Sequence, residues 1–166
     1  MSNVFPRQIT APPIRAVASN GCYIIDENGK RYFDGSGGAA VSCLGHGDPD
    51  VIKAIQDQTS KMAFAHTGFF SSDPAEELAE LLVQHAPGEL DRVYFVSGGS
   101  EAVEAALKLA RQFHIENGEP KRRHIIARKQ SYHGNTLGAL AAGGNKWRRN
   151  QFEPILINVS HIAPCY

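Results

Sequence analysis

The stretch Asp91-Arg-Val-Tyr-Phe-Val-Ser-Gly-Gly-Ser-Glu-Ala-Val-Glu-Ala-Ala-Leu-Lys-Leu-Ala-Arg111 decides the fold of this chain. Val93–Val96 is an apolar run of β-branched and aromatic residues, which predicts a strand. The run ends at Ser97-Gly-Gly-Ser100, after which apolar residues recur at helical spacing. The sequence therefore predicts a strand that leads through a glycine turn directly into a helix.

The first turn of that helix has the features of an anion site. Its backbone N–H groups have no partner within the helix and lie at the positive end of the helix dipole, which favours a phosphate. Gly99 would let the backbone approach the anion, and Ser100 would add a hydroxyl. A purely structural role stays open, because glycine tolerates unusual backbone angles and serine caps helices. The turn is neither a Walker loop nor a Gly-x-Gly-x-x-Gly fingerprint.

Composition and charge restrict the class of protein. The 166 residues correspond to about one ordinary domain. Lys plus Arg and Asp plus Glu number 17 each, so no net charge attracts nucleic acid or an anionic membrane. No apolar run reaches the roughly 20 residues of a membrane span, and the first residues lack the pattern of a secretory signal. We expect a cytoplasmic protein with no nucleic-acid partner and no membrane partner.

The cysteines and histidines do not form a metal-binding pattern. Cys22, Cys43 and Cys165 lie far apart without a Cys-x-x-Cys pair, which suits a reducing compartment and packing roles. The seven histidines are also scattered, and no pair has the spacing of a helical metal site. We expect no bound metal.

An arm and a hairpin are predicted at the start of the chain. Residues Met1 to Ala18 contain three prolines and no periodicity, which indicates an extended arm that lies on another surface. Asn28-Gly29 separates the apolar run Tyr23–Ile25 from Arg31–Phe33. Asn-Gly supplies the positive φ angles of a tight turn, so these two runs should pair as a hairpin.

The segment from Asp34 to Gly47 is rich in small residues. Such a segment either lines a cavity or packs its backbone closely, since glycine serves both needs. Its His46 is either a proton carrier or a hydrogen-bonded structural histidine, and the structural role is the simpler interpretation.

Two helices are predicted from the same start signal. Asp48-Pro49 and Asp73-Pro74 each place a capping aspartate before a proline suited to the first helical position. Between them, Phe64–Phe70 gathers rings that either line a pocket or anchor a loop.

Two further apolar runs, His124–Arg128 and Ile155–Val159, predict two more buried strands. Because strands and helices alternate, we expect right-handed crossovers and a largely parallel sheet. Ligands of such sheets bind beyond the carboxyl ends of the strands. Ser97–Ser100 and Gln130–Gly134 both lie at such ends, so they should approach one crevice.

The combination of Ser97–Arg111 with Ser131-Tyr-His-Gly134 closely resembles the class III (ω-type) aminotransferases, which are pyridoxal phosphate enzymes of fold type I. Asn28–Asp34 and Leu44-Gly-His46 are also similar to the amino-terminal region of that family. The resemblance extends from about Cys22 to Tyr166. It implies an α/β fold, comprising a small-domain hairpin with helices and the first strands of the large-domain mixed sheet. We assign residues 1–70 to the arm, hairpin and interface segment, and residues 71–166 to an incomplete large cofactor-binding domain.

The resemblance implies a site for pyridoxal 5′-phosphate. Gly99 and Ser100 correspond to the phosphate-binding pair of the family. Tyr132 corresponds to the aromatic residue that stacks on the pyridine ring, and His133 lies beside it in the motif.

A substrate-side loop is also implied by the resemblance, at Gly37, Gly38 and Ala39. One departure is visible at the anion site, where the chain reads Ser97-Gly-Gly-Ser100 and the family commonly has Asn-Ser-Gly-Thr or Asn-Ser-Gly-Ser. A hydrogen bond from the first position of this turn is therefore in doubt.

The resemblance implies amino-group transfer from an amine or amino acid to a 2-oxo acid, by a transferase that is a homodimer at full length. Two groups needed for that reaction lie, in the family, beyond residue 166: the lysine that bonds the cofactor and the carboxylate that keeps its pyridine nitrogen protonated. None of the lysines here has the family's lysine context: Lys30, Lys53, Lys61, Lys108, Lys121, Lys129 and Lys146. We therefore expect an amino-terminal fragment of an aminotransferase, with no catalytic residue in this chain.

Two alternative functions stay open. In the first alternative, the chain is an inactive remnant that serves as an interaction or phosphate-binding module. In the second, it is part of a pyridoxal phosphate-dependent decarboxylase, aminomutase or racemase of the same fold. Substrate-side groups, of which this part shows few, would distinguish these enzymes.

Overall fold

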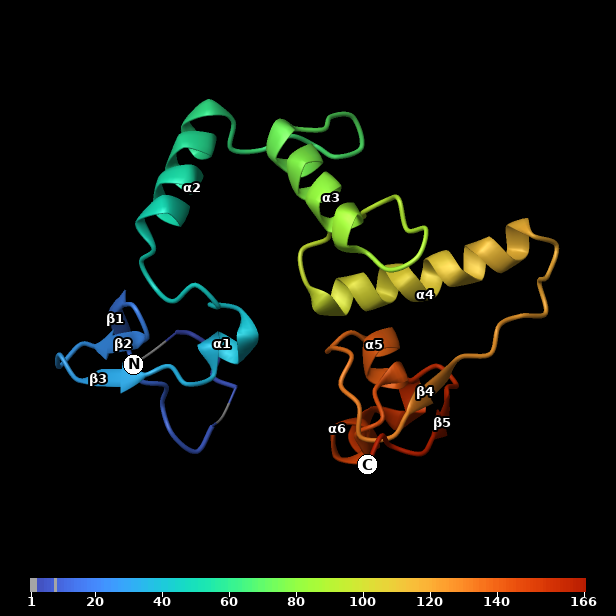
Figure 1. Ribbon diagram of the computed structural model, residues 1–166. Helices are drawn as coiled ribbons and strands as arrows, with labels where there is room; N and C mark the ends of the chain where they lie inside the picture. Colours follow the sequence, from blue (N-terminus) through green and yellow to red (C-terminus); the bar gives the residue numbers. More distant parts are fainter. Residues whose placement is uncertain (1–2, 8) are drawn as a thin grey trace. The chain divides into compact units, whose positions relative to one another are not determined.

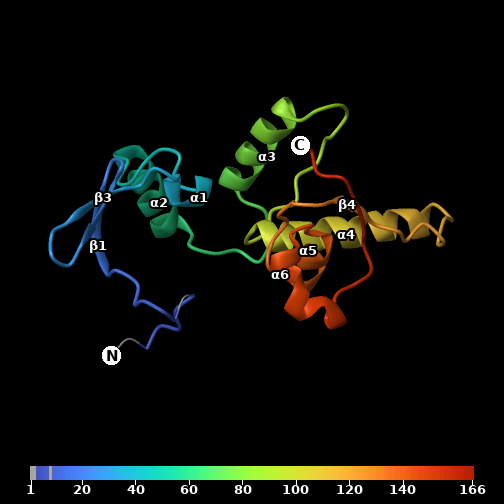
Figure 2. The same ribbon diagram turned by 90° about the horizontal axis from the view of Figure 1, so that it is seen from below.

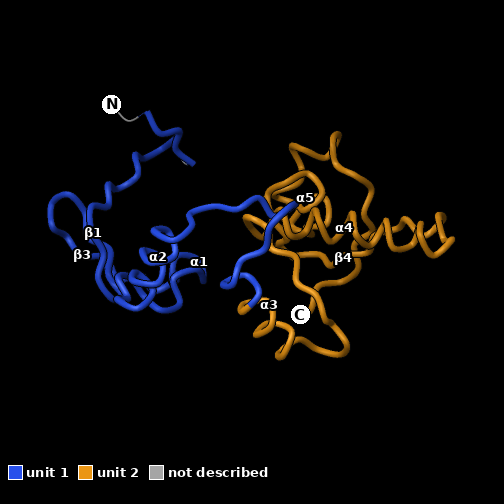
Figure 3. Tube along the Cα trace, turned by 90° about the horizontal axis from the view of Figure 1, so that it is seen from above, with its two compact units in different colours: residues 1–76 blue, residues 77–166 orange. Residues whose placement is uncertain are grey.

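A computed structural model describes residues 3–7 and 9–166 of a mixed α/β chain. The arm predicted over the first eighteen residues falls partly on residues 1, 2 and 8, which lie outside the described residues. The chain forms two compact units, Met1–Glu76 and Glu77–Tyr166, shown in two colours in Figure 3. Each unit is described by itself.

The first unit opens with a three-stranded antiparallel sheet in chain order, visible in Figure 1. Its strands are β1 (Ala16–Asn20), β2 (Tyr23–Asp26) and β3 (Arg31–Phe33). The hairpin predicted around Asn28-Gly29 is confirmed, since β2 pairs with β3 and Gly29 has a φ of 78°. The buried Asp26 stabilises the turn, because its carboxylate accepts hydrogen bonds of 2.9 Å from the N–H groups of Asn28 and Lys30.

Strand β1 was not predicted, because its residues form the end of the expected arm. All five side chains of β1 are exposed, and the strand pairs with β2 through an irregular register near Val17. A strand without a buried face has no alternation of apolar and polar residues to reveal it. Strand β1 therefore forms because its backbone pairs with the edge of β2, and the pattern of its side chains does not predict it.

Three helical elements follow, namely α1 (Gly37–Ala40), α2 (Pro49–Lys61) and α3 (Asp73–His85), and α3 continues across the boundary into the second unit. Helix α2 starts as predicted, because the side chain of Asp48 accepts hydrogen bonds of 3.0 Å from the N–H groups of Asp50 and Val51. Helix α3 begins at Asp73 itself, one residue earlier than predicted. The carbonyl of Ser72 accepts the first helical hydrogen bonds there.

The second unit contains a long helix, a two-stranded sheet and short helices. Its elements are α4 (Gly99–Glu116), β4 (Ile126–Arg128), α5 (Leu137–Ala142), α6 (Lys146–Arg149), the 3-10 helix η1 (Asn150–Ile155) and β5 (Ser160–Ile162). Strands β4 and β5 are parallel, with Ala127 opposite His161, and α5 lies against α4 (Figure 2). The parallel crossover predicted for this part of the chain is present.

Two strand predictions in the second unit are wrong. Val93–Val96 pairs with no strand in the described part of the chain. The strand predicted at Ile155–Val159 is displaced to β5: Ile155 ends η1, residues 156–159 pair with no described strand, and only Ser160–Ile162 pair with β4. Apolar β-branched residues favour a strand, but a strand forms only where a neighbouring backbone pairs with it.

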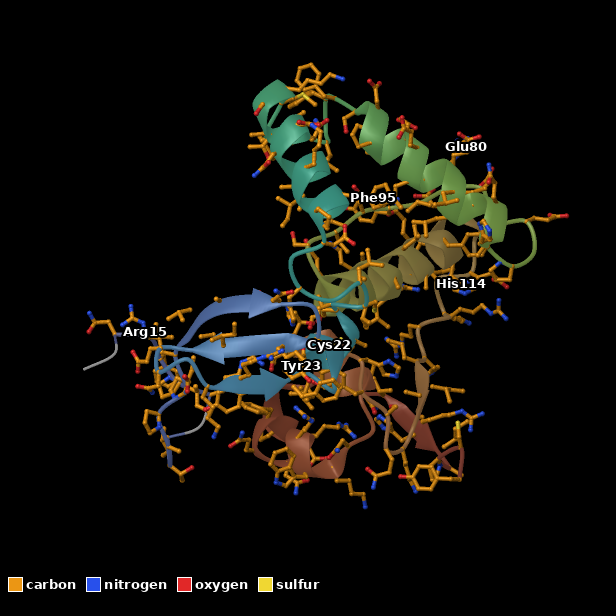
Figure 4. All side chains as sticks on the ribbon, turned by 60° about the vertical axis from the view of Figure 1, so that its left-hand side comes forward. Arg15, Cys22, Tyr23, Glu80, Phe95 and His114 are labelled. Carbon is orange, nitrogen blue, oxygen red and sulfur yellow. The ribbon has the colours of Figure 1, made fainter. Side chains whose placement is uncertain are left out.

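Small side chains make up the buried apolar core of the described residues. These are Ala139, Ala141, Ala142 and Val159. Larger apolar side chains stay exposed: Phe113 on α4 is 60% exposed, and Phe95, labelled in Figure 4, is 42% exposed. None of the described helices is both long and apolar enough to span a membrane.

Candidate functional site

The amino terminus of α4 forms an open set of backbone donors. Gly98 precedes the helix with extended backbone and provides no side-chain cap. The N–H groups of Gly99, Ser100 and Glu101 have no acceptor among the described residues. A Cβ added at Gly98 or Gly99 would meet no atom within 4 Å. Free donors at the positive end of an 18-residue helix suit an anion.

Glu101 stabilises the turn that precedes the helix. Its carboxylate accepts a hydrogen bond of 2.8 Å from the backbone N–H of Ser97. The backbone donor at the first position of the turn is therefore already engaged within the chain. Glu101 lies in the first helical turn, where acidic residues are enriched, and this start signal could have drawn attention to it in the sequence.

Ser100 connects the start of α4 with the segment that leads into α5. Its hydroxyl oxygen accepts a hydrogen bond of 2.8 Å from the N–H of Asn135, and its carbonyl accepts one of 3.4 Å from the hydroxyl of Thr136. Gly134 packs so closely that a Cβ there would lie 2.5 Å from the Ser100 hydroxyl oxygen. The two segments expected at one crevice are thus in direct contact.

Tyr132 and His133 lie on the exposed loop between β4 and α5. The ring of Tyr132 is 65% exposed, and the guanidinium of Arg148 lies 5.1 Å from its centroid, which is a cation–π geometry. His133 is exposed.

A pocket of about 390 Å³ lies beside this loop. It is lined by Gly134, Asn135, Leu140, Trp147, Arg148, Asn150, Gln151 and Phe152. The sequence prediction missed Arg148, whose signal is the run of basic and aromatic residues Lys146-Trp-Arg-Arg149. The described residues contain no cluster of His, Cys, Asp and Glu side chains suited to a metal ion.

Glu104 on α4 is a second residue of the candidate site that the sequence prediction missed. Its Oε1 atom accepts hydrogen bonds from the N–H groups of Gly138, at 2.8 Å, and Ala139, at 3.1 Å. The Thr136 hydroxyl, with those two N–H groups, lowers the pKa of Glu104, so this carboxylate stays ionised at neutral pH. Its partners lie more than thirty residues away in the chain, and no local pattern indicates them.

Ser131 and Gly144 shape the other end of the loop. The hydroxyl of Ser131 donates a hydrogen bond of 2.6 Å to the carbonyl of Arg128 and accepts one of 3.1 Å from the N–H of Gly144. A Cβ at Gly144 would lie 1.9 Å from the Arg128 carbonyl oxygen, so only glycine fits. The serine of the Ser-Tyr-His-Gly motif therefore has a structural role here.

In the first unit, residues 37 to 40 form a left-handed turn. The φ angles are 56° at Gly37, 61° at Gly38, 65° at Ala39 and 66° at Ala40. L-residues disfavour this region, because the Cβ approaches the following carbonyl oxygen. The two alanines are therefore strained, and the surrounding contacts must hold them in place.

The carboxylate of Asp34 supplies those contacts. It accepts hydrogen bonds from the Gly38 N–H at 3.0 Å, the His46 Nε2–H at 2.9 Å and the Ser42 hydroxyl at 3.2 Å. The hydrogen bond from the Gly38 N–H contributes most to lowering the pKa of Asp34 to about 2, and the hydrogen bond from His46 contributes next. His46 is thus a structural partner of Asp34. A Cβ at Gly45 would lie 3.0 Å from the carbonyl of Gly21, which supports close backbone packing in this segment.

Comparisons with known proteins agree with this fold. The family model described as Aminotransferase class-III matches residues 4–166. An uncharacterized aminotransferase of Schizosaccharomyces pombe is 48% identical over 155 residues, which are 93% of this chain and 34% of that protein.

Solved structures are similar over nearly the whole chain. The adenosylmethionine-8-amino-7-oxononanoate aminotransferase of Methanocaldococcus jannaschii has a TM-score of 0.92 at 30% identity, covering 98% of this chain and 38% of its own. An amine transaminase from an uncultivated Pseudomonas species, in its PLP-bound form, has a TM-score of 0.91 at 30% identity, covering 100% of this chain and 39% of its own.

The predicted fold class, that of the fold type I pyridoxal phosphate-dependent transferases, is confirmed by these similarities. The chain spans about a third of the length of curated relatives that it matches, namely 34% of the Schizosaccharomyces pombe protein and 36% of an uncharacterized aminotransferase of Bacillus subtilis.

Proposed function

The chain belongs to the class III aminotransferases, and from this membership we propose that it forms part of the cofactor site of a pyridoxal phosphate-dependent transaminase. The proposed reaction moves an amino group from an amine or amino acid to a 2-oxo acid. Enzymes of this class use pyridoxal phosphate, as the PLP-bound relative illustrates.

One observation carries the proposal, namely the open donors at the start of α4. The N–H groups of Gly99 and Ser100 point out of an 18-residue helix without an acceptor in the described chain. The dianionic phosphate of the cofactor fits such donors, because they match its oxygens and the helix dipole favours its charge. We propose that these two residues hold the phosphate.

Tyr132 and His133 are proposed to face the ring of the cofactor. The exposed ring of Tyr132 can stack on a pyridine, and its loop is attached to Ser100 through Asn135. When bound, pyridoxal phosphate supplies the carbonyl that accepts amino groups and the electron sink that stabilises the carbanion. The residues of this chain would bind and orient it.

The left-handed turn of the first unit is proposed as the substrate-side loop. Gly37, Gly38 and Ala39 are held by Asp34, whose hydrogen bonds stabilise a backbone that would otherwise be strained. A rigid, small-residue backbone suits a surface that limits the size of a bound substrate. We keep the assignment of residues 1–70 and 71–166 to separate domains as part of this proposal.

The lysine that bonds the cofactor is proposed to lie outside these 166 residues. Among the lysines of this chain, Lys129 and Lys146 line a pocket with Trp147, and none has the sequence context of the family's lysine. We therefore propose that the isolated 166-residue chain does not transaminate.

We also propose that the full-length protein is a homodimer in the cytoplasm. Exposed large apolar side chains support an interface, with Phe113 as an example. The three cysteines are free, which suits a reducing compartment. Sedimentation velocity would test the dimer, and a monomer at micromolar concentration would contradict it.

Cofactor binding by the full-length protein tests the proposed site. We expect pyridoxal phosphate to bind at least about a hundredfold more tightly than pyridoxal, because the aldehyde without phosphate cannot use the helix donors. Equal affinity for the two compounds would contradict the phosphate role of Gly99 and Ser100.

Borohydride reduction of the bound cofactor, followed by peptide mass spectrometry, tests the position of the lysine. We expect the reduced cofactor on no peptide within residues 1–166 when one equivalent is added. Stoichiometric labelling of one of the seven lysines in this chain would contradict the proposal.

A further inference from the structure

Ser100 and Glu104 form one continuous bonding face on α4. They are four residues apart, so they lie on the same side of the helix. Ser100 bonds the N–H of Asn135 and the hydroxyl of Thr136, and Glu104 bonds the N–H groups of Gly138 and Ala139. The start of α5 is therefore fixed to α4 through four of the five residues from 135 to 139.

Helix α5 depends on Glu104 for its first turn. The residue at its N-cap position, Thr136, makes no side-chain capping hydrogen bond. The N–H groups of the second and third helical residues, Gly138 and Ala139, would otherwise lack acceptors. Glu104 supplies both acceptors and a negative charge at the positive end of the short helix. One carboxylate from another helix thus replaces a local cap.

The glycines at the contact show that this attachment is close. A Cβ at Gly138 would lie 2.5 Å from Oε2 of Glu104. A Cβ at Gly134, whose φ is 135°, would lie 2.5 Å from the Ser100 hydroxyl oxygen. Because Gly134 and Gly138 have no side chains, the backbone on both sides of Thr136 can pack directly against Ser100 and Glu104 of α4.

We propose that Glu104 is a positioning residue for the cofactor site, an inference that rests on the function proposed above. By fixing the first turn of α5 to α4, it holds the preceding loop, with Tyr132 and His133, at a constant distance from Gly99 and Ser100. Glu104 itself touches neither the phosphate nor the ring in this role.

The position of the loop determines whether the two parts of the site can act on one molecule. Phosphate donors and a stacking ring bind the same ligand together only when both are held in the correct geometry. Without Glu104, the amides of α5 would be left unpaired, and the loop would be attached to α4 only through Ser100. The ring would then take up several positions, and most of them would not stack on a cofactor held by its phosphate.

Replacement of Glu104 in the full-length protein tests this role. Glu104→Ala removes the acceptor, Glu104→Gln keeps an acceptor oxygen without the charge, and Glu116→Ala removes an exposed carboxylate from the same helix as a matched control. We expect Glu104→Ala to weaken pyridoxal phosphate binding about tenfold, since charge-assisted hydrogen bonds to buried amides are lost. We expect Glu104→Gln to restore most of that affinity and Glu116→Ala to match the wild type.

Two further readouts separate positioning from a general loss of stability. The absorbance and circular dichroism of the bound cofactor should change in Glu104→Ala, because the stacked ring loses its fixed orientation. Amide hydrogen exchange of the cofactor-free protein should accelerate at Gly138 and Ala139 in Glu104→Ala and be unchanged in Glu116→Ala. If Glu104→Ala does not fold, Glu104→Gln and Glu104→Asp provide the same comparison.

The outcomes distinguish this inference from the proposed function. Wild-type binding of pyridoxal phosphate with no difference between Glu104→Ala and Glu116→Ala would overturn the positioning role and leave the cofactor site intact. Faster exchange at Gly138 in a protein that binds no pyridoxal phosphate would overturn the proposed function. Cofactor binding and optical signals that change only in the Glu104 variants, with rescue by glutamine, would support both.

Discussion

The hydroxyl oxygen of Ser100 accepts a hydrogen bond of 2.8 Å from the backbone N–H of Asn135, which lies 35 residues farther along the chain. This contact joins the glycine turn before α4 to the loop that follows β4. The two sequence motifs of the chain are therefore parts of one local structure. It also makes Ser100 important for stability before any ligand is bound.

Replacement of Ser100 by alanine should destabilise the protein without any cofactor. The N–H of Asn135, which is exposed, would lose its protein acceptor, and we expect this loss to cost about 0.5 to 1 kcal/mol. Urea unfolding of the cofactor-free protein measures this difference. Ser97→Ala is the matched control, because Ser97 uses its backbone N–H in its hydrogen bond to Glu101, and the substitution should change stability by less than about 0.5 kcal/mol. Equal losses in both variants would contradict the structural role of the Ser100 hydroxyl.

Replacement of Gly144 by alanine should be among the most damaging single changes in the second unit. The new Cβ would lie 1.9 Å from the Arg128 carbonyl oxygen, and backbone atoms cannot rotate away as side chains can. We expect a loss of about 3 kcal/mol or more, or failure to fold. Gly35→Ala is the comparison, because its Cβ would meet only the ring edge of Phe33, at 3.2 Å. A thermal midpoint for Gly144→Ala equal to that of Gly35→Ala would rule out the close approach.

Gly138 and Glu104 should be energetically coupled. Gly138→Ala places a Cβ 2.5 Å from the Glu104 carboxylate and should displace it from its hydrogen bonds. In a protein that already carries Glu104→Ala, the three atoms that the new methyl group approaches most closely are absent, and alanine favours the helix over glycine by up to about 1 kcal/mol. We therefore expect Gly138→Ala to destabilise the wild type and to be neutral or stabilising in the Glu104→Ala background. A double-mutant cycle of unfolding free energies measures the coupling, and strictly additive values would refute it.

Acid should weaken the first unit through Asp34. The folded-state pKa of Asp34 is lowered to about 2, whereas an unfolded aspartate titrates near 3.9. A lowered folded pKa means that the stabilisation is present above the unfolded pKa and is lost as the pH falls from about 4 to 2. Asp34→Asn should therefore be less stable at neutral pH and should show a smaller additional loss between pH 4 and pH 2.

Thermal midpoints of the wild type and Asp34→Asn across this pH range measure the effect. Asp57→Asn is the matched control, because Asp57 forms an exposed ion pair with Lys53. Exposed pairs of this kind contribute little to stability. Identical pH profiles for the wild type and Asp34→Asn would show that the carboxylate does not stabilise the turn.

Glycine at the strained alanines should stabilise the protein. Ala39 and Ala40 have φ angles of 65° and 66°, a conformation that costs an L-residue roughly 1 to 2 kcal/mol. Glycine adopts it freely but loses more backbone entropy on folding, so we expect a net gain of about 0.5 kcal/mol for each replacement. Ala54→Gly, within the regular helix α2, should instead destabilise by about 1 kcal/mol. Urea denaturation measures the change in unfolding free energy for each variant. A loss of stability on replacing Ala39 or Ala40 by glycine would contradict the proposed backbone strain.

Local signals explain which parts of the fold were predictable from the sequence. The hairpin at Asn28-Gly29 and the start of α2 at Asp48 depend on contacts within a few residues, so a short stretch of sequence contains both partners. Val93–Val96 was wrongly predicted as a strand, because pairing depends on a second segment that the run itself does not specify.

The candidate site divides in the same way. The free amides at Gly99 and Ser100 follow from the start of a helix directly after two glycines, which is visible locally. Glu104 and Arg148 were missed, since their contacts join residues far apart in the chain or depend on how a short helix places one side chain over Tyr132. The contacts of Glu104 and Arg148 depend on how the folded elements pack together. Helical periodicity in the sequence indicates only which residues share one face of a helix.

The left-handed turn at residues 37 to 40 also has a stereochemical consequence. Four consecutive residues there wind in the sense opposite to the right-handed helices α2 and α4, in the region where D-amino acids are unstrained. In a semisynthetic protein, D-alanine at position 39 or 40 would keep the methyl composition of the natural residue and remove its torsional strain. The turn is thus a place in an all-L polypeptide where the opposite chirality fits the backbone better.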